Sequence, residues 1–398
     1  METHDLNIDI TSSASDRFAD PDSQSILDRR AFVQIATLGS ATFLLNPETS
    51  RATSDSATAQ TTSGSSRTVS KGTGMLLTQK LRRTDLTVSR IAYGTNFDGL
   101  DSKASDFVEK AAQVLHGVYD EGINLIDLAD GYNDGKSESA LGVMLRQSPN
   151  LRRNIVIQTK CGILPPAASA PDEDWILDLS ADHIVRAAEG SLQRLGTDHI
   201  DILLLHMPDP LMDPNEVAQA LDRLKHAGKV RYFGVSNFNA VQIELLQRYL
   251  NQPLVVNQIQ MGLQHYSAMI TDVNNRVVGF GAIVDYCNLH DIQVEAYSPL
   301  MGEVDPRRNL LRPPADAPPE VKKAAQVLVD MAKEKNVSPS AIALAWLLRH
   351  PAHIIPVVGS INAEHIKQNC AAVDVTLTRE EWTRLLAASV SIQSSQGT

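Results

Sequence analysis

The sequence predicts an α/β fold in which eight parallel strands and their connecting helices close into a TIM-type (β/α)8 barrel. Short apolar runs alternate with helical patterns over about 300 residues, and runs of this length are typical of strands buried on both faces of a parallel sheet. Polar residues follow several runs, at the strand ends where such barrels hold their functional groups. No G-x-G-x-x-G loop follows the first run, which disfavours a doubly wound sheet.

A β-hairpin over residues 75–90, turning at Arg83-Thr84-Asp85, is expected before the barrel, and a C-terminal helix after it. The eight strands are expected at 90–95, 123–128, 154–160, 200–206, 230–236, 254–260, 292–297 and 354–358. Periodicity predicts helices from Phe107 to Tyr119, Ala181 to Leu195, Asn215 to His226, Ala240 to Leu250, Val321 to Lys335 and Ala363 to Ala372.

Composition narrows the class of protein. The chain has 398 residues, 43% of them hydrophobic, which is enough for a sizeable core. Its net charge of −11 argues against a nucleic-acid partner, which would need a clustered basic face. The second half has no apolar run of about 20 residues, so no stable membrane span is expected. Cys161, Cys287 and Cys370 are too scattered for a disulfide framework or a zinc site.

The N-terminal segment differs from the rest. Arg29-Arg30 is followed by Phe32 and by a stretch without charge from Ala31 to Pro47, a pattern that resembles a twin-arginine export signal. Ala57-Thr58-Ala59 offers a cleavage site. We therefore expect a signal segment at 1–59, a linker at 60–74, the barrel at 75–390 and a tail at 391–398. Export machinery is then a partner and the location periplasmic, or cytoplasmic if the segment is only a disordered tail.

Two connections are too long for plain loops, Cys161 to Leu179 and Pro299 to Pro319. Both leave C-terminal strand ends, where long loops usually shape or close a site. Trp175 and Met207 are expected to line the substrate pocket. The arginines of the second loop suggest a strap over a tightly held cofactor.

Four polar residues stand at or just after predicted strand ends: Asp127, Tyr132, Lys160 and His206. Reduction of a carbonyl needs a hydride on carbon and a proton on oxygen. A tyrosine pKa of about 10 is high for this task, and a lysine ammonium beside it would stabilise the phenolate and lower that pKa. A carboxylate keeps the lysine charged, and a histidine can hydrogen-bond the substrate oxygen. The four together predict a site with Tyr132 as general acid and base.

The hydride requires a nicotinamide cofactor, and three further strand ends can hold it. Ser236 and Asn237 follow the fifth strand, Gln258 stands in the sixth, and Tyr297 offers an aromatic face at the seventh. The simpler alternatives are that Tyr297 packs the barrel mouth and that Ser236-Asn237 caps the next helix.

Three segments resemble the aldo-keto reductase family: Asn124 to Tyr132, Ser137 to Gly142 and Gly234 to Phe238. Residues 201–246 are similar to a bacterial branch of that family, and the resemblance spans about 75–390. It implies the same roles for the four polar residues. It also implies a set of cofactor-binding positions: Gly94, Thr95, Ser236, Asn237, Gln258, Tyr297, Ser298, Leu300, Gly359, Ser360, His365, Gln368 and Asn369.

The sequence at the expected phosphate-binding site departs from the family pattern. Many members have an arginine where this chain has His365, and some have a lysine where it has Gly359. Histidine is only fractionally charged at neutral pH. We therefore expect NADP(H) and keep NAD(H) open.

The expected function is interconversion of an aldehyde or ketone and its alcohol. One alternative is a nicotinamide-binding regulatory subunit with little turnover. Another is a metal-dependent barrel hydrolase, but no His-x-His pair occurs in the chain and no metal site is expected.

Overall fold

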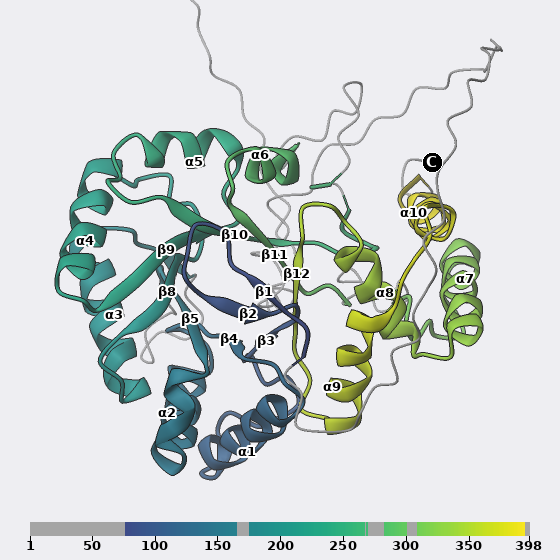
Figure 1. The fold of residues 1–398 in the computed structure, drawn as a ribbon, viewed down its shortest axis with the longest axis horizontal. Coiled ribbons are helices and arrows are strands. Elements are labelled where there is room, and N and C mark those ends of the chain that lie inside the picture. Colours follow the sequence, from purple (N-terminus) through teal and green to yellow (C-terminus); the bar gives the residue numbers. More distant parts are fainter. Residues whose placement is uncertain (1–75, 165–174, 267, 270–281, 301–308, 395–398) are drawn as a thin grey trace, which may run out of the picture. The chain divides into compact units, whose positions relative to one another are not determined.

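The computed structural model describes residues 76–164, 175–266, 268–269, 282–300 and 309–394. Within them, eight parallel strands hydrogen-bond in the order β3-β4-β5-β8-β9-β10-β11-β12 and close on themselves, because β12 pairs with β3 (Figure 1). Helices α1 to α5 lie outside this ring of strands. The predicted (β/α)8 barrel is confirmed.

The barrel strands are short, apolar and almost wholly buried, as expected for strands that are covered on both faces. They are β3 (Ala92–Gly94), β4 (Leu125–Asp127), β5 (Val156–Cys161), β8 (Ile200–Leu205), β9 (Val230–Ser236), β10 (Leu254–Gln260), β11 (Gln293–Tyr297) and β12 (Ile355–Val358). Each one lies within or close to its predicted range.

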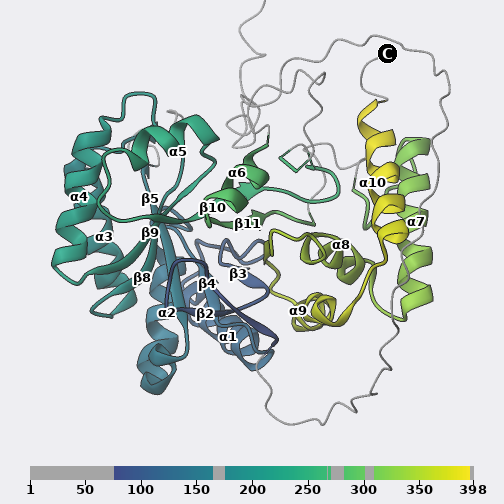
Figure 2. The ribbon, with the colours of Figure 1, turned by 45° about the horizontal axis from the view of Figure 1, so that its top comes forward.

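The described helices are α1 (Phe107–Asp120), α2 (Lys136–Gln147), α3 (Ala181–Leu195), α4 (Pro214–His226), α5 (Ala240–Gln247), α6 (Ile283–Leu289), α7 (Pro319–Lys335), α8 (Pro339–Leu348), α9 (Ala363–Cys370) and α10 (Arg379–Ser394). Short 3-10 turns follow α2 and α9. Ser180 caps α3 as expected. Figures 1 and 2 show the C-terminal helix α10 running beside α7.

Sequence periodicity missed α2, α6 and α8. Every residue of α8 from Ala341 to Leu348 is buried, so the segment has no polar face to give a helical period. Helix α2 begins after Gly135. Glycine has no side chain that could cap the helix, so the sequence carries no N-cap signal there. The short α6 spans only seven residues.

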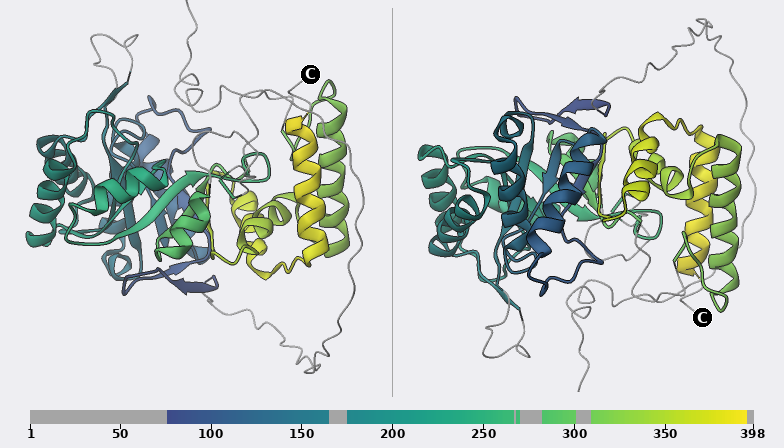
Figure 3. Two further views of the ribbon diagram at one scale, coloured as in Figure 1. Left: turned by 90° about the horizontal axis from the view of Figure 1, so that it is seen from above. Right: turned by 90° about the horizontal axis from the view of Figure 1, so that it is seen from below.

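The hairpin of β1 (Thr78–Lys80) and β2 (Thr87–Ser89) is antiparallel, as predicted. Figure 3 shows it at one end of the barrel. Leu81, Leu86 and Val88 are buried in one cluster with barrel residues such as Leu125 and Val256. The hairpin therefore closes the N-terminal end of the barrel and leaves the C-terminal end for chemistry.

The first long loop contains a small antiparallel pair that the sequence did not predict, β6 (Ile163–Leu164) with β7 (Ile176–Leu177). The expected signal segment, the linker, Arg307 and Arg308 lie outside the described residues. In the part that is described, no helix is long and apolar enough to cross a membrane.

Two helical glycines make a matched test of the helix packing. An added Cβ at Gly142 in α2 would lie 2.4 Å from the Arg194 carbonyl oxygen at the end of α3, whereas one at Gly117 in α1 meets nothing within 4 Å. We expect Gly142→Ala to destabilise the protein by about 1–3 kcal/mol through overpacking. Gly117→Ala should stabilise it by about 0.5–1 kcal/mol through helix propensity. Urea unfolding midpoints measure both, and a Gly142→Ala midpoint at or above wild type would refute this packing.

Candidate active site

The barrel brings the four predicted catalytic residues together at the C-terminal ends of three neighbouring strands. Asp127 is the last residue of β4, Lys160 lies in β5, and His206 directly follows β8. Tyr132 stands in the loop between β4 and α2. Because the strands are parallel and in register, with Asp127 beside Gln158 and Lys160 beside Leu204, these side chains share one end of the barrel.

Lys160 is the centre of the group. Its side chain is fully buried, and its Nζ donates to Asp127 Oδ2 at 2.7 Å and to the Leu128 carbonyl oxygen at 2.9 Å. Tyr132 Oη lies 3.5 Å from the same nitrogen. Burial alone would lower the pKa of Lys160, but Asp127 and Tyr132 outweigh it and raise that pKa. The lysine is therefore an ammonium.

The pKa of Tyr132 differs from the sequence expectation. Lysine was expected to lower it, and Lys160 does act in that direction. Burial is the larger effect, however, and Asp127 adds to it, so the pKa of Tyr132 is raised above its ordinary value. The hydroxyl thus holds its proton in the structure, and Lys160 limits the rise rather than reversing it.

His206 faces Tyr132 edge-on, with ring centroids 5.8 Å apart and an interplanar angle of 77°. Burial and the charge of Lys160 hold the pKa of His206 well below its usual value. The ring is therefore neutral at neutral pH. Its Nδ1 is buried and has no hydrogen-bond partner among the described residues.

The residues expected to bind nicotinamide line the same end of the barrel. Tyr297 Oη donates to Asn237 Oδ1 at 3.0 Å, and Asn237 Nδ2 donates to Ser236 Oγ at 3.0 Å. Asn237 and Ser298 adopt positive φ values of 65° and 50°. Thr95 donates through Oγ1 to the Asp127 carbonyl oxygen at 3.0 Å.

The residues expected at the phosphate and adenine end gather at the start of α9. Asn362 caps this helix by accepting from the amides of Glu364 and His365. Ser360 Oγ lies 3.5 Å from His365 Nδ1, and Arg312 Nη2 lies 3.3 Å from His365 Nε2. Sequence reasoning placed Arg312 only in a possible strap, whereas the structure puts it beside His365.

Comparisons with known proteins agree with this geometry. The model of the aldo/keto reductase family matches residues 90–389. The chain belongs to the aldo/keto reductase family.

The chain matches two relatives over most of their length. The chain is 37% identical over 308 residues to 6-dehydroglucose reductase of Agrobacterium fabrum, covering 77% of this chain and 95% of that protein. It is 34% identical over 276 residues to oxidoreductase YdhF of Escherichia coli, covering 68% and 84%.

Two solved structures of the family are similar at 26% sequence identity. An aldo/keto reductase from Klebsiella pneumoniae in complex with NADP and acetate matches with a TM-score of 0.59, covering 75% of this chain and 90% of that one. A holo form of an aldo-keto reductase from Bacillus halodurans matches with a TM-score of 0.64, covering 79% and 96%.

Polar groups at the start of α9 would suit the phosphate end of a nicotinamide dinucleotide. The guanidinium of Arg312 and the Ser360 hydroxyl are donors suited to phosphate. Gly94 and Gly359 approach closely, since a Cβ on Gly359 would lie 3.2 Å from the Gly94 carbonyl oxygen. Gln368 bonds Glu364 and Asn369 is buried, while Leu300 is partly buried.

Sequence reasoning missed two polar residues of the reductase's barrel interior. Gln158 Nε2 donates to Asp127 Oδ1 at 2.8 Å and to Glu295 Oε2 at 2.6 Å. Gln258, which was expected on the cofactor side, bonds the same two carboxylates. The available signal was the presence of polar residues within predicted buried strands: Gln158 follows Ile155-Val156-Ile157, and Glu295 follows Ile292-Gln293-Val294.

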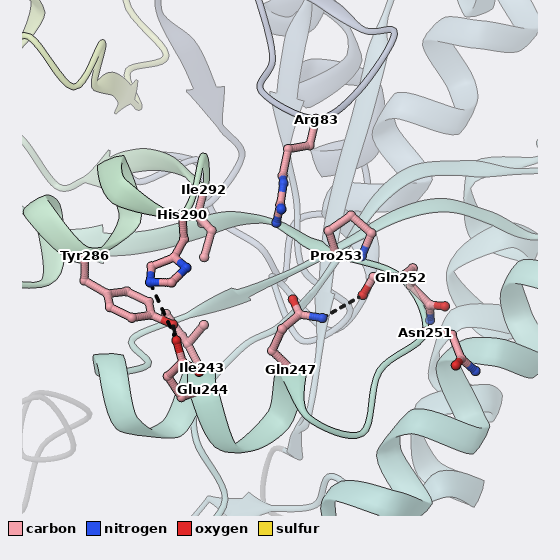
Figure 4. Close-up of a pocket in the computed structure, with 10 residues that line it drawn as sticks. All are labelled: Arg83, Ile243, Glu244, Gln247, Asn251, Gln252, Pro253, Tyr286, His290 and Ile292. Atoms are coloured by element: carbon pink, nitrogen blue, oxygen red, sulfur yellow. Dashed lines mark hydrogen bonds and ion pairs between the residues drawn. The ribbon is translucent and has the colours of Figure 1, made fainter.

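A cavity of about 310 Å³ lies away from this chemistry, at the N-terminal ends of β10 and β11. Figure 4 shows Arg83 of the hairpin on one side and the Tyr286–His290 ring pair on another. Glu244 already accepts from Tyr286 Oη at 2.6 Å. No residue of the catalytic group lines this cavity, so we do not place the reaction there. Among the described residues, no cluster of His, Cys, Asp and Glu is arranged to hold a metal ion.

Proposed function

We propose that this family member is an NADP(H)-dependent oxidoreductase that interconverts a carbonyl and an alcohol, with Tyr132 as general acid and base. The observation that supports it most is the chain of contacts from Asp127 through Lys160 to the Tyr132 hydroxyl, with His206 edge-on beside it. Each charged member of this chain is buried, so its electrostatic effect is weakly screened.

The role of each catalytic residue follows from its charge. A nicotinamide cofactor, when bound, would supply the hydride to the carbonyl carbon. As negative charge develops on the carbonyl oxygen, Tyr132 Oη gives its proton to that oxygen, which leaves a phenolate. Lys160 stabilises the phenolate, and Asp127 keeps Lys160 charged and in place. Neutral His206 orients the oxygen by a hydrogen bond. In alcohol oxidation, Tyr132 takes the proton back.

The first long loop borders the side of the site where we propose that the substrate binds. Gly131 lies near Trp175, since a Cβ on Gly131 would be 3.8 Å from the indole ring, which brings Trp175 of the first long loop next to Tyr132. Relatives from Agrobacterium fabrum and Novosphingobium aromaticivorans are 6-dehydroglucose reductases, 37% and 34% identical to this chain. A sugar-derived carbonyl is therefore the first substrate to assay, followed by aromatic aldehydes and keto acids.

Removal of the Tyr132 hydroxyl tests the mechanism. We expect Tyr132→Phe to lower kcat by about 10²–10⁴-fold, the usual contribution of a placed proton donor, while cofactor binding is retained. NADPH oxidation at 340 nm measures turnover, and fluorescence titration measures binding. Tyr232→Phe is the control, because Tyr232 Oη bonds Asp85 of the hairpin at the other end of the barrel. Unchanged turnover in Tyr132→Phe would exclude this role, and a wild type with cofactor binding but little turnover would favour a regulatory subunit.

The preference for NADP(H) rests on Arg312 beside His365 at the start of α9. We expect NADPH to bind more tightly than NADH. Arg312→Ala should weaken NADPH binding about tenfold, corresponding to the loss of one charge-assisted contact, and should leave NADH binding little changed. The control is Lys367→Ala, which removes an exposed charge from α9, the helix that contains His365. Equal losses for both cofactors in Arg312→Ala would contradict a contact with the 2′-phosphate.

We further propose export by the twin-arginine route, on the strength of Arg29-Arg30, Phe32 and the uncharged stretch that follows. In a bacterium with that machinery, the wild type should appear in the periplasmic extract. Replacing Arg29 and Arg30 together by lysine should keep it in the cytoplasm, whereas Arg51→Lys should not. Immunoblots of the two fractions measure this, and a cytoplasmic wild type would disprove export.

A further inference from the structure

Two buried carboxylates share the barrel interior below Lys160. Asp127 ends β4, and Glu295 lies in β11 with no exposed surface. Two amides bridge them. Gln158 Nε2 lies 2.8 Å from Asp127 Oδ1 and 2.6 Å from Glu295 Oε2, and Gln258 Nε2 lies 3.0 Å and 2.8 Å from the same two atoms. The catalytic carboxylate and Glu295 are thus held by one set of donors.

The donors of these amides are fully used. An amide nitrogen carries two hydrogens, and each glutamine here gives one to Asp127 and one to Glu295. For Gln258, the amide oxygen is then the atom left to accept from a bound nicotinamide carboxamide. The bridge to Glu295 therefore decides which end of the Gln258 amide is available to the cofactor.

The remaining atoms of the cluster are all acceptors. Gln158 Oε1 and Glu295 Oε1 are buried and have no partner in the described part of the chain. An ionised Glu295 can only accept hydrogen bonds, so ionisation leaves this oxygen with an unsolvated charge. A proton on it provides a donor in a place that has a surplus of acceptors.

The charges around Glu295 also favour its protonated form. The charged groups that face Glu295 are Asp127 and Lys160. One ammonium balances one carboxylate, and Asp127 already lies 2.7 Å from it. Burial, together with the charge of Asp127, raises the pKa of Glu295 to about 7.

We propose that Glu295 is a positioning residue that works as a neutral carboxylic acid, holding Asp127 and the Gln258 amide through shared hydrogen bonds. Ionisation of Glu295 places a second negative charge before Lys160. That charge competes with the Tyr132 phenolate for the ammonium and opposes its formation. Turnover therefore falls as Glu295 loses its proton. This inference rests on the proposed function of Tyr132.

The pH dependence of kcat tests the proposal in the intact protein. At saturating NADPH, wild-type kcat should fall by about tenfold between about pH 6 and about pH 8.5. Glu295→Gln cannot ionise, so the ratio of its kcat values at those two pH values should be close to one. Glu189→Gln, which alters a surface pair with Lys229, should keep the wild-type ratio. Glu295→Met removes the shared acceptor and should weaken NADPH binding in fluorescence titrations. A Glu295→Gln ratio equal to that of the wild type overturns the proposal.

Thermal unfolding gives a second measurement that does not need turnover. The pKa of Glu295 is raised in the folded state. The protein therefore loses stability against unfolding as the pH rises from the ordinary pKa of a glutamate through about 7. The unfolding midpoint of Glu295→Gln relative to wild type should therefore rise between about pH 5 and about pH 8. A constant difference refutes the neutral acid even if no carbonyl substrate is found. Loss of turnover in Tyr132→Phe with a wild-type pH ratio in Glu295→Gln would leave the proposed function standing and remove only this inference.

Discussion

The buried ion pair between Lys160 and Asp127 is the interaction on which the rest of the site depends. An ammonium with no exposed surface is costly unless it is paired and hydrogen-bonded, and Lys160 meets both conditions through Asp127 and the Leu128 carbonyl. The pair can form only if β4 and β5 lie side by side in the register that the closed barrel imposes. The charge it keeps limits the rise in the pKa of Tyr132, and it adds to burial in lowering the pKa of His206.

The two ends of the barrel are built for different tasks. At the N-terminal end, the hairpin inserts Leu81 and Leu86 over the interior and excludes water from it. At the C-terminal end, the interior layer changes from leucine, isoleucine and valine to Gln158, Gln258 and Glu295. The apolar cluster at the N-terminal end gives the catalytic group a surrounding of low dielectric on one side. The hydrogen-bonded polar layer at the C-terminal end gives it fixed dipoles on the other.

The residues proposed to bind the cofactor come from segments far apart in the chain. Ser236, Asn237 and Tyr297 form one hydrogen-bonded series at the mouth, and Arg312 reaches His365 from a loop more than fifty positions earlier. Asn237 and Ser298 at this end of the barrel adopt positive φ, as do residues elsewhere such as Arg83 and Asn336.

The sequence by itself determined the barrel, the order of its strands and the residue types at their ends. Alternating apolar runs and helical patterns carry that information locally, so Asp127, Tyr132, Lys160 and His206 could be identified from the order of residues along the chain. The same patterns missed α8, whose wholly apolar surface has no period. Tertiary structure alone decided the pKa of Tyr132, because burial depends on neighbours distant in sequence. It alone also revealed Glu295, since the bridge from Glu295 through Gln158 to Asp127 joins three strands that only barrel closure brings together.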